Sequence, residues 1–351
     1  MLYKKDILTY KNFDSLYRSN LKLIEEFYRH KPYISKKHRI FLLKKRGLSF
    51  KDEVNAISIL QNIPYYRLVN GFKDTILESD EENYSEFYFE DLIDLYDFDR
   101  EISLFLLKYI QIFEESMLAT LSNEISYHIG YKEEDYLNKV NYNLGKKTVS
   151  GKSEQDILFA NINRILSDKT KPIIQPVVHY SKIHKNVPPW ILLQYMSFGD
   201  KKYLYKLCKE QVKNSILLHY FDDSDESFKT FMLYSLNIMN CYRNCAAHGE
   251  VISNNAFLQL PNIHKREYIY VLNSQNYRYR QYNQGVGSDG IFSLILVLNR
   301  LFRKRTTIKA QFIDELINII ETFQNKNPRL YEKFIKKTKF PKDYEFLLQD
   351  K

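Results

Sequence analysis

Apolar side chains recur at three- and four-residue steps through most of this chain, which is the period of an amphipathic helix. The clearest stretch predicts a helix that begins at residues 97–99, where aspartates suit a first turn, and ends near Gly130. A second helix is predicted from about Glu226 to Gly249, because glycine is typical of the position just past a helix end. These two helices carry the strongest periodicity in the chain.

Weaker periodic stretches predict helices along most of the remaining sequence, and only one segment resembles a strand. The chain is therefore expected to be all-α, a helical bundle with room for one short hairpin. We expect an N-terminal helical unit at 1–90, a central helical domain at 91–260 and C-terminal helices packed on it at 261–351. The further expected elements are helices at 35–46, 51–61, 153–165, from Pro188, 201–218, 291–302 and 308–323, a loop at 141–152, a turn at Phe198-Gly199-Asp200 and a short strand at 267–272.

Composition fits a globular protein with an anionic partner. Of the 351 residues, 44% are hydrophobic and 27% are charged, which is enough apolar material for a substantial core. The formal net charge of +9 favours nucleic acid as the partner, although a solubilising surface would explain it as well. The 29 tyrosines and 23 phenylalanines could stack on bases, but most are expected in the core.

Several classes of protein are excluded by what the sequence lacks. Three cysteines, without a Cys or His partner at zinc spacing, predict reduced thiols and neither a disulfide framework nor a metal site. The longest apolar run, residues 291–298, is too short to cross a bilayer, and the N-terminus has no secretory signal. No cofactor fingerprint or nucleophile elbow is present. We expect a cytoplasmic protein without cofactor, metal or membrane contact.

The residues that carry candidate chemistry are Arg243-Asn244-Cys245-Ala246-Ala247-His248, at the end of the second helix. Arg and His suffice to cut RNA: a base takes the 2′-hydroxyl proton, an acid protonates the leaving oxygen, and a cation stabilises the phosphorane. The spacing alone is a chance-level signal, and an equally good interpretation is a capping His beside a surface Arg. The position of the motif at the end of an amphipathic helix gives it weight.

Helix geometry adds two constraints on this motif. Five residues turn about 500°, so Arg243 and His248 would lie about 140° apart, whereas Asn244 and His248 would share a face. The arginine must therefore reach around the helix. A single His cannot readily serve as both acid and base, so a site built from two copies of the helix predicts a homodimer.

Basic and aromatic clusters outside the motif are candidate RNA contacts, with a solvated charged face as the alternative for each. An acidic group at Asp91, Asp94, Asp97, Asp99 and Glu101 is dense enough for a two-metal nuclease, but is more simply the first turn of a helix with a solvated loop. The predicted RNA contacts are Lys44, Lys45, Arg46, Tyr65, Tyr66, Arg67, Lys201, Lys202, Arg278 and Arg280.

Six ordered blocks between residues 31 and 255 resemble the AbiD/AbiF abortive-infection proteins of bacteria. The blocks are Lys31-Pro32-Tyr33-Ile34-Ser35, Leu42-Leu43-Lys44-Lys45-Arg46-Gly47-Leu48, Ile63-Pro64-Tyr65-Tyr66-Arg67-Leu68, Phe98-Asp99-Arg100-Glu101, Pro189-Trp190 with Ser197-Phe198-Gly199, and Tyr242-Arg243-Asn244-Cys245-Ala246-Ala247-His248. The resemblance implies an all-helical HEPN fold, a metal-independent endoribonuclease site shared across a dimer, and a role in phage defence. For part of the family it also implies association with a small structured RNA.

Carried over by position, Arg243 would contact the scissile phosphate, Asn244 would orient it, and His248 would be the acid or base. The chain departs from the family just after the motif, where Gly249-Glu250-Val251-Ile252 replaces a further His or Ser and an Arg, and Asn254 or Asn255 would match a later family Asn. Two hypotheses follow from this comparison. One is a HEPN ribonuclease, and the other is an RNA-binding protein of the same fold that does not cleave.

Overall fold

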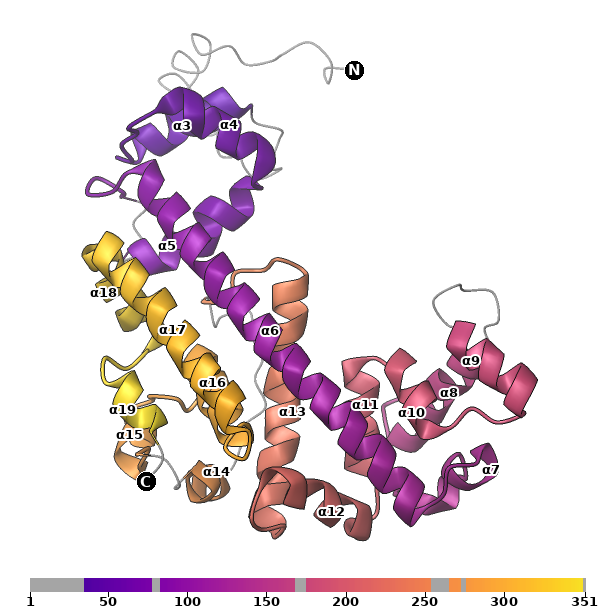
Figure 1. The fold of residues 1–351 in the computed structure, drawn as a ribbon. Helices are drawn as coiled ribbons and strands as arrows, with labels where there is room; N and C mark the ends of the chain where they lie inside the picture. Colours follow the sequence, from indigo (N-terminus) through magenta and orange to yellow (C-terminus); the bar gives the residue numbers. More distant parts are fainter. Residues whose placement is uncertain (1–34, 78–82, 168–174, 254–264, 273–275, 350–351) are drawn as a thin grey trace, which may run out of the picture. The chain divides into compact units, whose positions relative to one another are not determined.

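The computed structural model describes residues 35–77, 83–167, 175–253, 265–272 and 276–349, without the side chains of residues 265–267 (Figure 1). Helices make up nearly all the regular structure of these residues, and no β-strand occurs among them. The expectation of an all-α protein is therefore confirmed. Three isolated β-bridges occur in the described residues, and one of them, the antiparallel bridge between Lys147 and Ser153, closes the end of the loop expected at 141–152.

The chain divides into two compact units between Tyr96 and Asp97. The described part of the first unit holds α3 (Lys36–Lys45), α4 (Glu53–Asn62), the π-helical turn η1 (Tyr66–Asn70) and α5 (Gly71–Ile76). Ser35 and Asp52 cap α3 and α4, because each side chain accepts a hydrogen bond from the backbone N–H three residues ahead. The expected three-part division, with boundaries near residue 90 and at 261, stays a prediction.

Helix α6 (Phe89–His128) is the longest in the chain, and the prediction that it begins at residues 97–99 was wrong. The carboxylate of Asp91 accepts a hydrogen bond from the backbone N–H of Tyr88 at 2.8 Å, which satisfies a donor at the true N-terminus. Phe89, Leu92 and Leu95 are buried and continue the apolar stripe upstream. The acidic residues from 91 to 101 are therefore helical, and no cluster suited to a metal ion occurs in the described residues.

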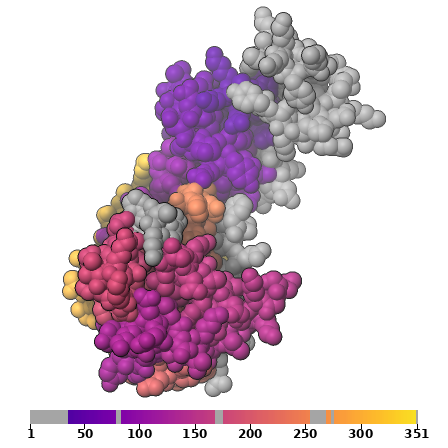
Figure 2. All heavy atoms as spheres, turned by 90° about the vertical axis from the view of Figure 1, so that its right-hand side faces the viewer, coloured from indigo at the N-terminus to yellow at the C-terminus, as the bar shows by residue number. Residues whose placement is uncertain are grey.

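The second unit runs from Asp97 onward and contains the rest of the helices. Helix α13 packs against α11, α12, α14 and α16, and α8 packs against α11 (Figure 1). On the face drawn in Figure 2, magenta and rose segments from the middle of the chain cover this unit. Its remaining elements are α7 (Glu133–Tyr136), η2 (Lys139–Asn141), α8 (Glu154–Ser167), α9 (Gln175–His179), η4 (Tyr180–His184), α10 (Pro189–Leu192), η5 (Leu193–Tyr195), α11 (Phe198–Leu207), α12 (Glu210–Tyr220), α13 (Glu226–Ala247), α14 (Lys265–Leu272), α15 (Tyr279–Asn283), α16 (Gly290–Leu301), α17 (Thr306–Lys326), α18 (Pro328–Thr338) and α19 (Tyr344–Leu348).

Two local expectations in this unit were wrong. The predicted turn at Phe198-Gly199-Asp200 is the first turn of α11, because the Ser197 hydroxyl accepts from the Asp200 N–H at 3.0 Å and caps the helix. The basic helix expected at 201–218 is two helices that break at Cys208. There the backbone N–H of Asn143 donates to the carbonyl of Leu207 at 2.7 Å, which joins the preceding loop to the end of α11.

The short strand expected at 267–272 was also wrong, because this segment is helix α14. Tyr, Ile and Val favour strands by intrinsic preference, but here Tyr268, Ile269 and Leu272 are buried. The Tyr268 hydroxyl donates to the carbonyl of Gly287 at 2.9 Å. Tertiary packing therefore decides the conformation of α14, which lies against α13.

The core of the second unit is built from apolar helices and paired aromatic rings. Every residue of α16 is buried. Phe98 stacks on Phe323 with ring centroids 3.9 Å apart, and Phe105 stacks on Phe312 at 5.1 Å, so that α6 is fixed against α17. Despite this apolar content, no helix in the described ranges is both long and apolar enough to span a bilayer.

Candidate functional site

Helix α13 presents the Arg243-to-His248 motif on its last turns. Asp225 caps the start of the helix by accepting hydrogen bonds from the N–H groups of Ser227 and Phe228, at 2.8 and 3.2 Å. A buried face then runs to Tyr242, which is 1% exposed. Beyond it Arg243 is half-buried, whereas Asn244 and His248 are exposed. The predicted helix thus carries its polar residues to a solvent-accessible end.

The end of α13 is a Schellman turn, in which two backbone hydrogen bonds close the last turn of the helix. Gly249 donates to the carbonyl of Ala246 at 3.1 Å, and Glu250 donates to the carbonyl of Cys245 at 2.9 Å. Gly249 has φ 65°, the left-handed conformation that glycine adopts most readily. His248 is the C-cap residue, with φ −86° and ψ 0°. The prediction of a glycine-terminated helix at this position is confirmed.

The side chain of Arg243 turns toward Asn244. Its Nη1 lies 3.5 Å from Oδ1 of Asn244, which is a long and therefore weak hydrogen bond. The backbone N–H of His248 donates to the carbonyl of Asn244 at 2.9 Å, so these two residues are stacked one turn apart on the helix. The structure thus brings Arg243 toward Asn244, which shares a face with His248, and a joint role of Arg243 and His248 stays a prediction.

Asp99 and Arg100 of α6 hold the segment that follows the motif. The carboxylate of Asp99 accepts hydrogen bonds from the backbone N–H groups of Ile252 and Ser253, at 3.2 and 2.9 Å. Arg100 donates both to the Asp99 carboxylate, at 3.0 Å, and to the carbonyl of Glu250. We call Asp99 and Arg100 the Asp–Arg clamp. Because it joins residues 150 or more positions apart, it fixes where α13 ends relative to α6.

The clamp is almost fully buried at its acidic member. Asp99 is 3% exposed, and Ile252 and Ser253 are buried as well. Burial raises the pKa of Asp99, while hydrogen bonds from Ser253 and Arg100 and the charge of Arg100 act in the opposite direction. The sequence assigns Asp99 to an acidic first turn and to one of the family blocks, without a structural role of this kind. No local signal identifies this pair, because the backbone groups that it holds lie more than 150 positions further along the chain.

Three asparagines lie along one side of α13 and lead from α11 toward the motif. Asn237 accepts a hydrogen bond from Nζ of Lys202 at 2.9 Å. A Cβ atom built on Gly199 would lie 3.8 Å from Oδ1 of Asn240, so the first turn of α11 approaches α13 closely here. Asn244 lies one turn beyond Asn240. The polar face of α13 is therefore continuous from α11 to the candidate site.

The three cysteines are not prepared for metal binding or nucleophilic chemistry. Burial raises the pKa of Cys208 to about 12, and burial together with nearby Glu250 raises the pKa of Cys245 to about 12. Burial also raises the pKa of Cys241. Because thiolates are the reactive and ligating form, the raised pKa values of these thiols disfavour both roles. All three are free of disulfide bonds.

The predicted RNA contacts fall into distinct environments in the two units. Lys44, Lys45 and Arg46 are exposed at the end of α3, although Lys44 pairs with Glu53. Tyr66 is 65% exposed, and Arg278 and Arg280 are exposed beside α15. Each of these residues can reach solvent, and an RNA role for them stays a prediction. Tyr65 and Arg67 are half-buried, and the ring of Tyr65 lies 4.9 Å from the Arg39 guanidinium.

Lys201 and Lys202 differ from the exposed group. Lys201 is 6% exposed, and its Nζ lies 2.8 Å from Oε1 of Glu114, so its charge is already neutralised inside the second unit. Lys202 is half-buried and bonded to Asn237, and burial lowers its pKa. An RNA phosphate would have to displace these partners. An RNA role for Lys201 and Lys202 stays a prediction.

Comparison with known proteins assigns the chain to a family. A family model described as Abi-like protein matches residues 58–254, which is more than half of the 351 residues. The chain belongs to the Abi-like protein family. The match includes both the Asp–Arg clamp and the Arg243-to-His248 motif. No curated protein and no solved structure matches the chain at a significant level.

Membership of the Abi-like family confirms the resemblance to abortive-infection proteins and places the chain among proteins of that defence role. The first resembling block, at Lys31, begins before the matched segment and lies almost wholly outside the described residues. Asn254 and Asn255, the candidates for a later family Asn, are also outside them. The HEPN subtype stays a prediction.

Proposed function

We propose that this Abi-like protein is a metal-independent endoribonuclease of the HEPN type that acts in anti-phage defence. The observation that carries the proposal is the end of α13, where Arg243 turns toward Asn244 and His248 caps the exposed helix terminus. A cation, an amide and an imidazole are the groups needed to bind a phosphate and move protons on and off ribose oxygens. Solvent access at this end allows an RNA strand to approach.

The reaction uses the nucleophile that RNA itself supplies. A base removes the 2′-hydroxyl proton, the 2′-oxygen forms a bond to the adjacent phosphorus, and the bond from phosphorus to the 5′-oxygen breaks as that oxygen receives a proton. The products are a 2′,3′-cyclic phosphate and a 5′-hydroxyl end. Arg243 stabilises the charge on the phosphorane, Asn244 orients the phosphate, and His248 transfers a proton.

Two copies of the chain would supply the two proton-transfer groups. Each copy contributes one Arg243 and one His248, so paired α13 ends give one imidazole as base and the other as acid. The exposure of Asn244 and His248 is compatible with such a pairing. Cleavage by a shared site should rise with the square of protein concentration where the monomer predominates, whereas a site within one chain gives a linear dependence.

The decisive experiment replaces His248 by Ala in the full chain. Because general acid–base catalysis typically contributes about 10²–10⁴-fold, cleavage should fall by at least about 100-fold while RNA binding is retained. His184→Ala, an exposed histidine in η4, is the matched control and should cleave at the wild-type rate. Wild-type cleavage should also persist in a metal chelator.

Two outcomes contradict the ribonuclease proposal. Wild-type protein that cleaves no RNA, with or without phage components, would leave the second candidate, a protein that grips a small structured RNA without cutting it. The departure after the motif, where the Schellman turn at Gly249 and Glu250 stands in place of further polar family residues, favours that candidate. Cleavage that disappears in chelator would refute the metal-independent mechanism.

A further inference from the structure

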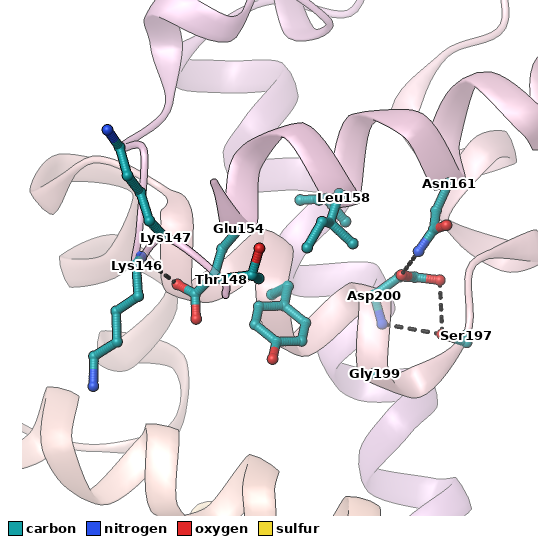
Figure 3. A pocket seen from close by; sticks show the side chains of 11 residues that line it. Lys146, Lys147, Thr148, Glu154, Leu158, Asn161, Ser197, Gly199 and Asp200 are labelled. Atoms are coloured by element: carbon teal, nitrogen blue, oxygen red, sulfur yellow. Dashed lines mark hydrogen bonds between the residues drawn. The ribbon is translucent and has the colours of Figure 1, made fainter. Parts of the chain in front are cut away.

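A pocket of about 290 Å³ lies between α8 and the first turn of α11, closed on one side by the loop before α8 (Figure 3). We call it the α8–α11 pocket. This volume lies just below the usual range for ligand sites, about 300–1,000 Å³, and suits a single nucleotide better than a larger molecule. Its polar groups separate into two ends: Asn161, Asp200 and Ser197 lie at one end, and Lys146 and Lys147 lie at the other.

We propose that the α8–α11 pocket binds the guanine base of one nucleotide in the RNA substrate. This inference rests on the proposed function, because it assumes that RNA reaches the end of α13. It adds a base preference that the Arg243-to-His248 motif cannot supply, since phosphate and ribose contacts carry no sequence information.

The acidic end of the pocket is held in place by its own hydrogen bonds. Asn161 Nδ2 donates to one carboxylate oxygen of Asp200 at 2.9 Å, and the Ser197 hydroxyl donates to the other at 2.7 Å. A carboxylate oxygen can accept more than one hydrogen bond, so both oxygens retain capacity. The result is an oriented pair of acceptors on a rigid helix turn. Figure 3 shows these three side chains joined at one end of the pocket.

Guanine is the base whose edge matches this pair of acceptors. It presents a ring N–H and an exocyclic amino group side by side, and a carboxylate can accept from both. Adenine, cytosine and uracil each place only one donor group on the corresponding edge, next to an acceptor that a carboxylate would repel. The second acidic side chain of the pocket, Glu154, does not compete, because Lys206 Nζ contacts both of its oxygens at 2.6 and 2.7 Å.

The remaining walls supply stacking and charge. Tyr203 lines the pocket with 36% of its surface exposed, and Leu158 provides a buried apolar floor. Base–aromatic stacking is a common source of affinity for single strands. Lys146 and Lys147 are exposed at the far end, where they can contact the phosphate of the same nucleotide.

The pocket lies close to α13, the helix that carries the candidate site. Gly199, which lines the pocket, faces Asn240, and Asn244 of the motif lies one turn further along the same face. Four residues of helix correspond to a rise of about 6 Å. A strand whose phosphate contacts Arg243 and Asn244 can therefore place a base in the pocket within a few nucleotides.

The test measures binding of guanosine, of the four nucleoside monophosphates, and of short RNAs with and without guanine, to the full-length protein. A pair of well-oriented base contacts contributes about 1–3 kcal/mol of discrimination, so guanosine monophosphate should bind about tenfold tighter than the other three. Asp200→Asn should abolish that preference, because it replaces one acceptor with a donor. Asp314→Asn makes the same charge change at an exposed position of α17 and should leave the preference intact.

Further variants separate the parts of the proposal. Lys146→Ala and Lys147→Ala should remove the advantage of guanosine monophosphate over guanosine but keep the base preference. Because these variants leave the hydrogen bonds of Asp200 intact, they test the pocket even if Asp200→Asn does not fold. Equal binding of all four monophosphates overturns the proposal. If guanosine monophosphate binds preferentially but RNAs with and without guanine bind equally, the ligand of the pocket is a free nucleotide. That outcome also overturns the proposal. A guanine preference that survives in His248→Ala supports the pocket independently of cleavage. A guanine preference in a wild-type protein that never cleaves RNA supports the pocket and refutes only the ribonuclease.

Discussion

Replacing Asp99 by Ala tests whether the Asp–Arg clamp holds the end of α13. The substitution leaves the buried N–H groups of Ile252 and Ser253 without their acceptor and removes the ion-pair partner of Arg100. An unsatisfied buried donor costs about 1–3 kcal/mol, and breaking a buried pair costs about 3–5 kcal/mol. The two costs arise from the same missing carboxylate and are not simply added, so we expect the free energy of unfolding to fall by about 3–5 kcal/mol.

The assay is denaturant unfolding of the full chain, followed by thermal melting, where this loss corresponds to roughly 6–20 °C for a unit of this size. Glu101→Ala is the matched control, since Glu101 lies two residues away on the same helix and is exposed; it should change stability by at most about 0.5 kcal/mol. RNA cleavage should fall with Asp99→Ala because the turn after His248 loosens. A loss of less than about 1 kcal/mol would refute the reasoning.

Three further perturbations test the structure. Lys201→Ala should cost about 3–5 kcal/mol by stranding Glu114, whereas Lys108→Ala, which breaks an exposed Lys–Glu pair, should cost less than about 1 kcal/mol, as read by denaturant unfolding; equal losses would contradict this. Gly249→Ala should cost about 1 kcal/mol, because φ 65° is strained for a side chain, and no change in melting temperature would rule the strain out. Since the folded-state pKa of Asp99 is raised, wild type should lose stability relative to Asp99→Asn as the pH rises from the unfolded pKa through the folded one; a constant difference in unfolding free energy across that window would argue against it.

The sequence predicted correctly those helices whose position depends on interactions within a few residues. Helix α13 follows from its apolar period, its capping Asp225 and the glycine at 249, all of which act within a few residues. The true start of α6 was missed because acidic residues at 97–99 resemble a first turn as closely as those at 90 and 91 do. Periodicity located the candidate motif correctly at the end of a helix.

The rest depends on contacts between distant parts of the chain. No residue near Asp99 in the sequence indicates that its carboxylate accepts a hydrogen bond from Ser253, because the two residues are 154 positions apart. The strand expected at 267–272 failed for a related reason, since burial of Tyr268 in a helical bundle outweighs the strand preference of its neighbours. The burial of Lys201 beside Glu114 was equally invisible in a run of lysines that looked solvated.

The pairing of lysines inside the second unit changes how the protein responds to salt. Lys201 is neutralised by Glu114, Lys206 by Glu154, and Lys229 by Glu210. RNA binding releases counterions only where a cation meets a phosphate, so ammonium groups that already face a carboxylate contribute little to that release. For the RNA binding proposed above, the slope of affinity against salt concentration should therefore be shallower than the clusters of Lys and Arg in the sequence imply.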